Sequence, residues 1–183
     1  MRIIGGQASG RRLASLAGSD TRPTGDRVRE ALFNIWQSRV PDARFFDAYA
    51  GTGAMGLEAL SRGAARAVFA EPHRGALKTL RRNVELVGLA DRAEVWPVPC
   101  EEAMAAFLQE GRQFDIIFCD PPWAKGLSDR VRMSLGGIVA PHGMVVVESR
   151  QSDAEVFLDG LEPIWTRRYG DTRLTAYQQP DAN

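Results

Sequence analysis

The tetrapeptide Asp120-Pro121-Pro122-Trp123 combines residue types that can activate the amino group of a nucleobase. Such an amine is a poor nucleophile because its lone pair is conjugated with the ring. The Asp120 carboxylate and the Pro121 carbonyl can accept its N–H groups and direct the lone pair at a methyl donor. Two prolines stiffen the loop and remove N–H donors, and the Trp123 ring offers a face to a flipped-out base. These four residues are predicted to be catalytic; the alternative is a rigid strand-to-helix turn with a core tryptophan.

A glycine-rich loop begins directly after the apolar run at residues 45–49. It places Gly51, Gly53 and Gly56 in the GxGxxG spacing, in which a backbone without Cβ atoms can turn sharply and lie close to a ligand. Glu71 follows about 20 residues later, where a carboxylate can accept hydrogen bonds from ribose hydroxyls. The loop and the acid together predict a nucleoside cofactor site that contains Gly51, Gly53 and Glu71.

Asp47, just before the glycines, discriminates between two nucleoside cofactors. A dinucleotide such as NAD would place its anionic pyrophosphate here, and a carboxylate would repel it. S-Adenosylmethionine instead carries an ammonium group and a sulfonium, which a carboxylate attracts. We therefore predict that Asp47 belongs to an S-adenosylmethionine site; the alternative is that it caps the turn. Glu101 or Glu102 is predicted near the adenine amino group, and the sequence leaves open which of the two.

The N-terminal segment carries an excess of positive charge. Residues 1–39 contain seven arginines and three acids, whereas the whole chain has a formal net charge of zero. Guanidinium groups pair well with phosphates and with guanine edges, so we predict that some of these arginines face RNA. The predicted RNA-binding residues are Arg2, Arg11, Arg12 and Arg22. The alternative is an ordinary solvated surface.

Short apolar runs alternate with helical patterns from residue 44 onward. The predicted strands are 44–49, 65–71, 93–98, 114–120 and 143–149. The predicted helices between them are 54–62, 73–87, 101–110 and 128–139. This alternation is typical of a parallel sheet with helices on both faces, and residues 164–178 add two strands around a turn at Gly170-Asp171. The predicted fold class is α/β: a Rossmann-like, doubly wound sheet of the class I methyltransferase type, mostly parallel with an antiparallel C-terminal hairpin.

An N-terminal extension precedes this sheet. Residues 2–4 and 11–14, which are separated by glycines, predict a short β-hairpin. After Pro23, Thr24 is a candidate N-cap for an amphipathic helix whose apolar residues recur at helical spacing. These apolar residues are Val28, Ala31, Leu32, Ile35 and Trp36.

Length and composition indicate an ordinary soluble, folded chain. It has 183 residues, of which 44% are hydrophobic and 25% charged. We expect residues 1–40 to form an RNA-facing extension packed on a methyltransferase domain at residues 41–183. We find neither a run of about 18 apolar residues nor the apolar stretch of a signal peptide, so we expect the chain in the cytoplasm. Cys100 and Cys119 lack metal-ligand or disulfide spacing, and we expect no metal.

Five motifs, read in order, resemble the RsmD family of bacterial 16S ribosomal RNA guanine-N2 methyltransferases. They are RIIGGQASGRRL, TRPTGDRVREALFN, DAYAGTGAMGLEALSRGA, DPPWAKGL and the terminal YGDT. The resemblance extends from Arg2 to about Tyr177. It implies that Gly51, Gly53 and Glu71 bind S-adenosylmethionine, and that the tetrapeptide that starts at Asp120 holds the guanine amine.

The same resemblance implies that Thr24 and Arg27 lie over the methionine end of the cofactor and that the basic hairpin faces RNA. It also implies a monomeric enzyme whose partner is 16S ribosomal RNA within a small-subunit assembly particle. Two positions depart from the family. Trp123 stands where Tyr or Phe is common, which enlarges the stacking face. The residue after the third strand is often Asp in the family, and it falls among residues 100–102 here.

The predicted function is transfer of a methyl group from S-adenosylmethionine to the N2 amine of a guanine in 16S ribosomal RNA. One alternative is the same chemistry on adenine or cytosine of DNA, although we expect no room for a separate target-recognition domain. A second is an NAD-dependent oxidoreductase, in which Asp47 and the tetrapeptide at Asp120 would have no role. A third is a non-catalytic RNA-binding module, which would show RNA affinity without turnover.

Overall fold

A computed structural model describes residues 1–16 and 23–180, with the backbone alone for Pro23 and Thr24. The helices are α1 (Pro23–Ile35), α2 (Ala54–Ser61), α3 (Arg74–Val87), α4 (Cys100–Gln109) and α5 (Asp129–Ile138), with a 3-10 turn at Ala90–Arg92. The strands are β1 (Arg44–Asp47), β2 (Arg66–Ala70), β3 (Ala93–Trp96), β4 (Phe114–Cys119), β5 (Val139–Arg150), β6 (Glu162–Tyr169) and β7 (Thr172–Gln178). Among the described helices, none is long and apolar enough to cross a membrane.

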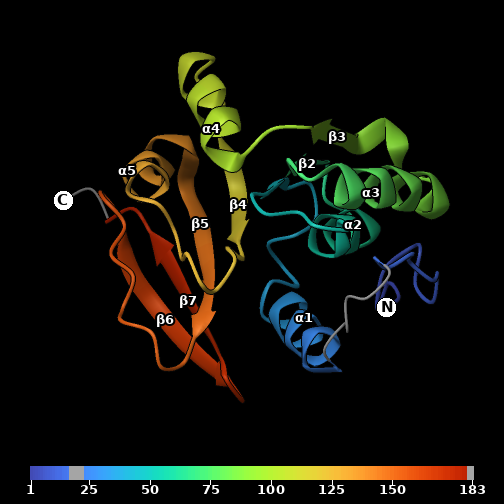
Figure 1. The fold of residues 1–183 in the computed structure, drawn as a ribbon, viewed down its shortest axis with the longest axis horizontal. Coiled ribbons are helices and arrows are strands. Elements are labelled where there is room, and N and C mark those ends of the chain that lie inside the picture. Colours follow the sequence, from blue (N-terminus) through green and yellow to red (C-terminus); the bar gives the residue numbers. More distant parts are fainter. Residues whose placement is uncertain (17–22, 181–183) are drawn as a thin grey trace.

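Seven strands of the described residues form one sheet in the order β3-β2-β1-β4-β5-β7-β6 (Figure 1). Strands β1 to β5 run parallel, and β7 lies antiparallel between β5 and β6. From β1, the strand order runs to β2 and β3 on one side and to β4 and β5 on the other. Ligands of such sheets bind where the order changes direction, beyond the carboxyl ends of the strands. The predicted doubly wound sheet with an antiparallel C-terminal hairpin is confirmed.

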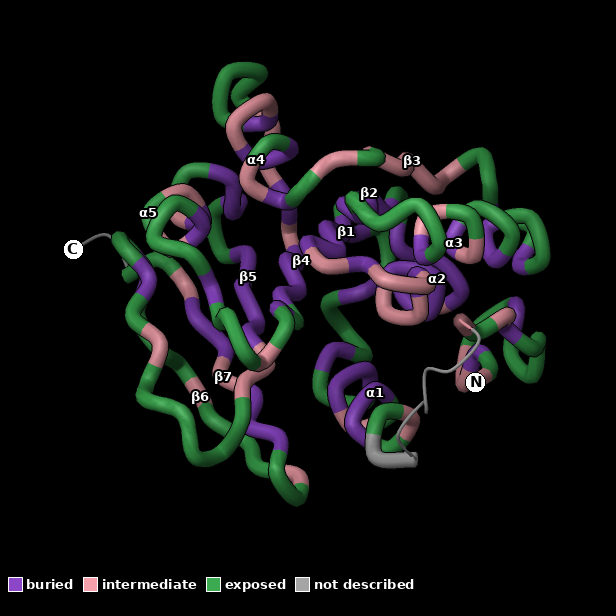
Figure 2. The backbone as a smooth tube through the Cα atoms, in the orientation of Figure 1, coloured by how far each residue is buried: buried purple, intermediate pink, exposed green. Residues whose placement is uncertain are grey.

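Alternating side chains of the strands face two separate hydrophobic clusters, as the two-residue period of a strand requires. In β1, Phe45 belongs to the cluster that α1, α2 and α3 cover. Phe46, the next residue, belongs to the cluster that α4 and α5 cover. Figure 1 shows helices on both faces of the sheet, and Figure 2 shows that burial is concentrated in the central strands while β6 is exposed at the edge.

The start of β5 differs from the prediction. The strand begins at Val139, which pairs with Phe114 of β4, and not at Gly143. The register then shifts before the pairing resumes farther along both strands. Pro141, which has no N–H to donate, and His142, with φ of 60°, lie in this irregular stretch. The stretch with Pro141 and His142, which the sequence leaves between a predicted helix and a predicted strand, therefore interrupts a strand without ending it.

Helix α1 begins at Pro23, so Thr24 lies inside the helix and the prediction that it is the N-cap is wrong. Proline is favoured at the first helical position because its missing N–H needs no partner there. The predicted apolar spacing holds for Val28, Leu32 and Trp36, which are buried. Ile35 is 42% exposed. Phe33 completes the buried stripe in its place and packs edge-on against Trp36.

The N-terminal extension packs on the face that α1, α2 and α3 cover. Arg2 and Arg12 form an isolated antiparallel bridge, so the predicted hairpin exists as one bridge without two full strands. Ile3 and Leu13 are buried in the cluster of that face. The buried Glu58 of α2 accepts the N–H groups of Ile4 and Gly5, both at 2.8 Å. The extension therefore shares the core of the sheet.

Candidate active site

A cavity of about 970 Å³ opens beyond the carboxyl ends of β1 and β4. This volume lies at the upper end of the roughly 300–1,000 Å³ that small-molecule sites span. Its walls bring together predicted residues that lie far apart in the sequence. These are Gly51, Glu71, Glu101, Asp120, Pro121, Pro122 and Trp123. One cavity thus joins the predicted cofactor loop to the predicted catalytic loop.

Glu71, just after β2, is held by the glycine loop. Its Oε2 accepts the N–H of Gly51 at 2.8 Å, and its Oε1 accepts the N–H of His73 at 2.7 Å. These two backbone bonds fix the carboxylate in the cavity wall. The His73 ring nitrogen also lies 3.1 Å from Oε1. A carboxylate offers about four acceptor positions, so Glu71 retains a position on Oε2 for a hydroxyl group of a ribose.

The glycines of the loop serve two different purposes. Gly51 lines the cavity and has φ of 55°, a left-handed conformation that favours glycine. Gly53 does not line the cavity, and a Cβ there would lie 2.3 Å from Leu80 Cδ1. A Cβ at Gly56 would lie 2.3 Å from Phe69 Cε1. The sequence predicts a sharp turn and ligand approach at Gly51 and Gly53. At Gly53 the structure shows the sharp turn, with φ of 86°, together with close packing against α3.

Asp47, at the end of β1, is 2% exposed and is absent from the described cavity wall. Its Oδ2 accepts the N–H of Gly56, in the first turn of α2, at 3.1 Å. Burial raises the pKa of Asp47 to about 7; the Gly56 bond opposes this shift, and the charges of Asp120 and Glu71 add to it. The Asp47 carboxylate therefore caps the turn, as in the alternative interpretation. It would attract a cationic cofactor only through the intervening glycine loop.

The first turn of α4 distinguishes the two candidate glutamates. Glu101 lines the cavity, whereas Glu102 is exposed and is absent from the described cavity wall. Oε1 of Glu101 accepts the hydroxyl of Ser128, the N-cap of α5, at 2.9 Å. Burial acts to raise the pKa of Glu101, but its backbone hydrogen bond and the Ser128 hydroxyl outweigh burial and lower it. Glu101 is therefore an ionised acceptor suited to an amino group.

The predicted catalytic loop leaves the end of β4. Asp120 is exposed at the cavity, and Trp123 is half-buried. The Pro122 carbonyl accepts the N–H of Lys125 at 2.8 Å, which closes a turn directly after the tetrapeptide. The guanidinium carbon of Arg150 lies 5.1 Å from the centroid of the Trp123 ring, within the range of a cation–π contact. The turn and this contact hold the loop over the cavity.

Helix α1 adds Asp26 and Arg29 to the cavity wall. Arg27 is exposed and is not among the described residues that line the cavity. Its predicted place over the methionine end of a cofactor stays a prediction. The Thr24 side chain and Arg22 lie outside the described residues.

Arg29 is a site residue that the sequence analysis missed. It is 4% exposed, its Nη2 donates to the Arg2 carbonyl at 2.7 Å, and its Nε lies 3.6 Å from Glu58 of α2. Arg29 precedes the buried Phe33 by one helical turn, so both lie on the same face. The partners that bury Arg29 lie in the N-terminal extension and in α2, so no local pattern in the sequence indicates its burial.

Known proteins that are similar to this chain are named methyltransferases, which agrees with the shared cavity described above. A model of the family described as conserved hypothetical protein 95 matches residues 1–178. The ribosomal RNA small subunit methyltransferase D of Escherichia coli K12 is 39% identical over 151 residues, which are 81% of this chain and 74% of that protein. The chain belongs to the RsmD family.

Two further relatives of this RsmD-family chain cover most of its length. The Haemophilus influenzae protein of the same name is 32% identical over 157 residues, 82% of this chain and 79% of that protein. The solved structure of Escherichia coli yhhF, described as a methyltransferase, has a TM-score of 0.84 and 34% identity, and the match covers 98% of this chain and 97% of that one. The family resemblance predicted from the five motifs is confirmed.

The N-terminal arginines of this RsmD-family chain differ in their surroundings. Arg2 and Arg12 are exposed. Arg11 is also exposed, but its Nη1 donates to the carbonyls of Leu86 at 3.1 Å and Val87 at 2.6 Å. These carbonyls end α3, where a cation stabilises the helix. Arg11 therefore already has a structural role, while the predicted RNA contacts of all three residues stay a prediction.

Proposed function

We propose that this RsmD-family methyltransferase transfers the methyl group of S-adenosylmethionine to the N2 amine of a guanine in 16S ribosomal RNA. The observation that carries the proposal is the shared cavity, in which Gly51 and Glu71 face the same space as the tetrapeptide that starts at Asp120. The substrate is supported by the relatives named ribosomal RNA small subunit methyltransferase D.

The residues of the cavity fit the proposed cofactor. Glu71 retains acceptor capacity for the ribose, and Glu101 is an ionised acceptor for the adenine amino group. Arg29, a buried cation in the wall, suits the cofactor's carboxylate. When bound, S-adenosylmethionine supplies an electrophilic methyl group on a sulfonium.

The catalytic loop acts on the amine. Asp120 accepts one N–H of the guanine amino group and the Pro121 carbonyl accepts another, so that the lone pair is directed into the cavity. As the new N–C bond forms, the bond from the methyl group to sulfur would break and its electron pair would stay on sulfur. The amine loses one proton, which the exposed Asp120 passes to solvent. Trp123 provides the stacking face for the extruded base. The larger indole supplies the function that Tyr or Phe has in the family.

The proposed setting is the cytoplasm, where the chain acts as a monomer on a small-subunit assembly particle. The test uses labelled S-adenosylmethionine with three acceptors: small ribosomal subunits that lack the methyl group, free 16S ribosomal RNA, and DNA. We expect label in ribosomal RNA and none in DNA. Transfer to DNA, or binding of NAD in place of S-adenosylmethionine in a calorimetric titration, would contradict the proposal.

A further inference from the structure

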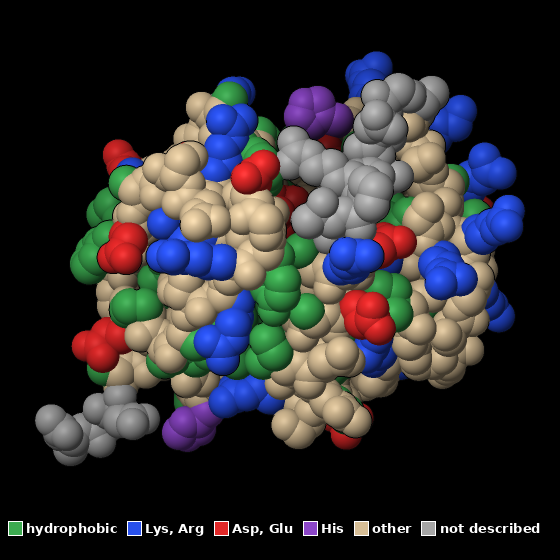
Figure 3. Space-filling model, turned by 90° about the horizontal axis from the view of Figure 1, so that it is seen from below, with side chains coloured by type: hydrophobic (Ala, Val, Ile, Leu, Met, Phe, Trp, Pro, Cys, Tyr) green, Lys and Arg blue, Asp and Glu red, His purple; other side chains and the backbone are tan. Residues whose placement is uncertain are grey.

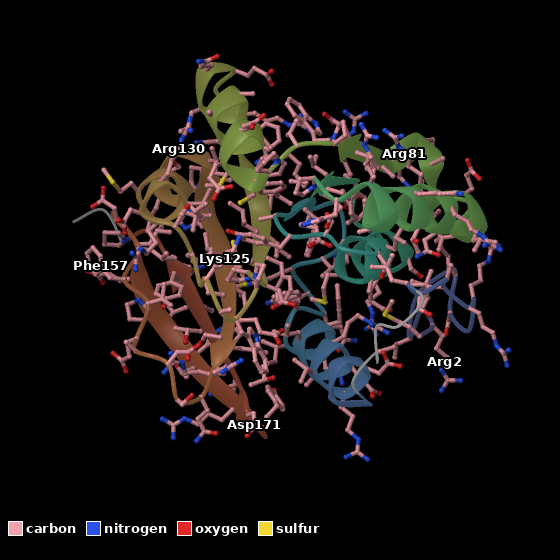
Figure 4. All side chains as sticks on the ribbon, viewed as in Figure 1. Arg2, Arg81, Lys125, Arg130, Phe157 and Asp171 are labelled. Atoms are coloured by element: carbon pink, nitrogen blue, oxygen red, sulfur yellow. The ribbon has the colours of Figure 1, made fainter. Side chains whose placement is uncertain are left out.

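One face of the β6–β7 hairpin continues the cavity wall outward. Arg150 on β5 and Thr172 on β7 are direct neighbours in the sheet, and both line the cavity. Tyr169 on β6 is the neighbour of Thr172 on the next strand. Directly opposed residues of adjacent strands share a face of the sheet. In Figure 4, Asp171 labels the tip of this hairpin.

Arg167 and Trp165 extend this face along β6, at alternate positions before Tyr169. Four residues of strand correspond to about 13 Å between Tyr169 and Trp165. Both rings are half-buried and pack on the cluster under α1, α2 and α3, which fixes them in place. Arg167 is exposed, and its guanidinium carbon lies 5.8 Å from the Trp165 ring centroid.

Trp165 lies on this face by regular alternation. Trp165, Arg167 and Tyr169 pair in unbroken register with Ala176, Leu174 and Thr172 of β7, and alternate residues of a strand point to the same face. The register shifts only before Trp165, where Ile164 is an extra residue on β6. Arginines and aromatic rings therefore alternate in one row along this face.

We propose that Arg150, Arg167, Trp165 and Tyr169, together named the hairpin face, bind single-stranded RNA next to the methylated guanine. This rests on the proposed function. Guanidinium groups neutralise phosphates, and aromatic rings stack on unpaired bases, which is how proteins hold single-stranded RNA. Figure 3 shows Lys and Arg side chains, with hydrophobic side chains beside them, on the half of the molecule that holds β6 and β7. The hairpin face begins at Arg150, over Trp123, so a strand entering the cavity continues onto it.

Neighbouring arginines of β6 provide a matched test. Arg167 lies on the hairpin face, whereas Arg168 pairs with Arg173 and lies on the opposite face of the same strand. For Arg167→Ala, we expect affinity for a 16S ribosomal RNA transcript to fall about 3- to 10-fold. The plot of log affinity against log salt should flatten by about 0.7, the value for one phosphate of a single strand. Arg168→Ala should match the parent, and S-adenosylmethionine affinity should be unchanged in both.

Trp165 tests the stacking part of the proposal. Trp165→Leu keeps an apolar side chain on the core but removes the ring, and we expect RNA affinity to fall about 5-fold or more. Trp165→Phe keeps a ring and should retain most of the affinity. Thermal unfolding checks that both variants fold. If Trp165→Leu does not fold, the comparison of Arg167→Ala with Arg168→Ala tests the proposal by itself.

Three results would contradict the proposal that the hairpin face binds RNA. Arg167→Ala could bind RNA with the affinity and salt dependence of the parent, or the Arg167 and Arg168 variants could lose affinity equally. Either result leaves the proposed function intact as long as the parent methylates ribosomal RNA. A parent protein that neither binds nor methylates ribosomal RNA would overturn the proposed function and the hairpin face together.

Discussion

At the residue scale, the Asp120 carboxylate lies at the end of β4 and opens to the cavity. Asp120→Ala removes the acceptor for the target amine, and we expect turnover to fall roughly 100-fold or more. Asp120→Asn keeps one oxygen acceptor and should retain more activity than the Ala variant. S-Adenosylmethionine affinity, measured by calorimetry, should stay near that of the parent in both. Turnover of the Ala variant at the parent rate would refute the catalytic assignment.

Glu101 and Glu102 form a matched pair for the cofactor site. Glu101 lines the cavity and Glu102 is exposed outside it. Glu101→Ala should weaken S-adenosylmethionine binding about tenfold, the scale of one hydrogen bond to a charged group. Glu102→Ala should bind like the parent. Calorimetry on both variants checks this, and a larger loss for Glu102→Ala would reverse the assignment.

Asp47 predicts a pH dependence of stability. Its pKa is raised from 3.8 to about 7 in the folded chain, so the folded state holds a proton that the unfolded state releases between these values. The contribution of Asp47 to the free energy of unfolding is therefore fully present below about pH 4. It decreases as the pH rises to 7 and is lost above pH 7, and the total decrease is roughly 4 kcal/mol at most.

Asp47→Asn removes this titration but keeps an oxygen acceptor for the N–H of Gly56. Relative to the parent, the variant should gain unfolding free energy as pH rises from 4 to 7, measured by urea denaturation without cofactor. A difference between the two proteins that stays constant over this range would show that Asp47 does not carry the raised pKa.

At the element scale, Arg11 and Arg12 separate a structural role from an RNA role. Arg11 binds the carbonyls that end α3, so Arg11→Ala should lower the free energy of unfolding by about 1 kcal/mol. Arg12→Ala should leave stability unchanged and flatten the salt dependence of RNA binding by up to about 0.9. Denaturation and RNA titrations on both variants check this. If the Arg12 variant keeps the parent's salt dependence, Arg12 does not contact RNA phosphates and belongs to an ordinary solvated surface.

The sequence predicted the elements of the sheet well because their patterns are local. Helix α3 ends at Gly88, whose left-handed φ of 72° the glycine allows, and the β6–β7 turn at Gly170-Asp171 separates two strands as predicted. The bulge at Ile164 was not predictable, because an extra residue becomes visible only when β6 is paired with β7. The same reason applies to the early start of β5 at Val139.

The candidate site was predicted where a motif fixes the backbone, as for Gly51 and for the tetrapeptide at Asp120. It was not predicted where a side chain acts through a distant partner. The buried ion pair of Arg29 with Glu58 joins α1 to α2, and no local spacing indicates it. For Gly53, the motif predicted the residue and the sharp turn, since its φ of 86° is left-handed, but not the close contact with Leu80.

At the scale of the whole molecule, the cavity lies between parts of the chain that have different tasks. The parallel strands supply the cofactor loop and the catalytic loop, while α1 and the N-terminal extension close one side through Asp26, Arg29 and Met1. The end of β5 and the β6–β7 hairpin extend the other side, at Arg150 and Thr172 respectively. A nucleoside cofactor and an extruded base can therefore meet inside the chain while the RNA remains outside.

The most direct test of the proposed function is the identity of the methylated nucleoside. Small subunits that lack the methyl group are incubated with labelled S-adenosylmethionine and the protein, and their ribosomal RNA is digested to nucleosides and separated. We predict that the label appears as N2-methylguanosine and is lost with Asp120→Ala. Label in methyladenosine or methylcytidine, or no label in ribosomal RNA, would contradict the proposed function.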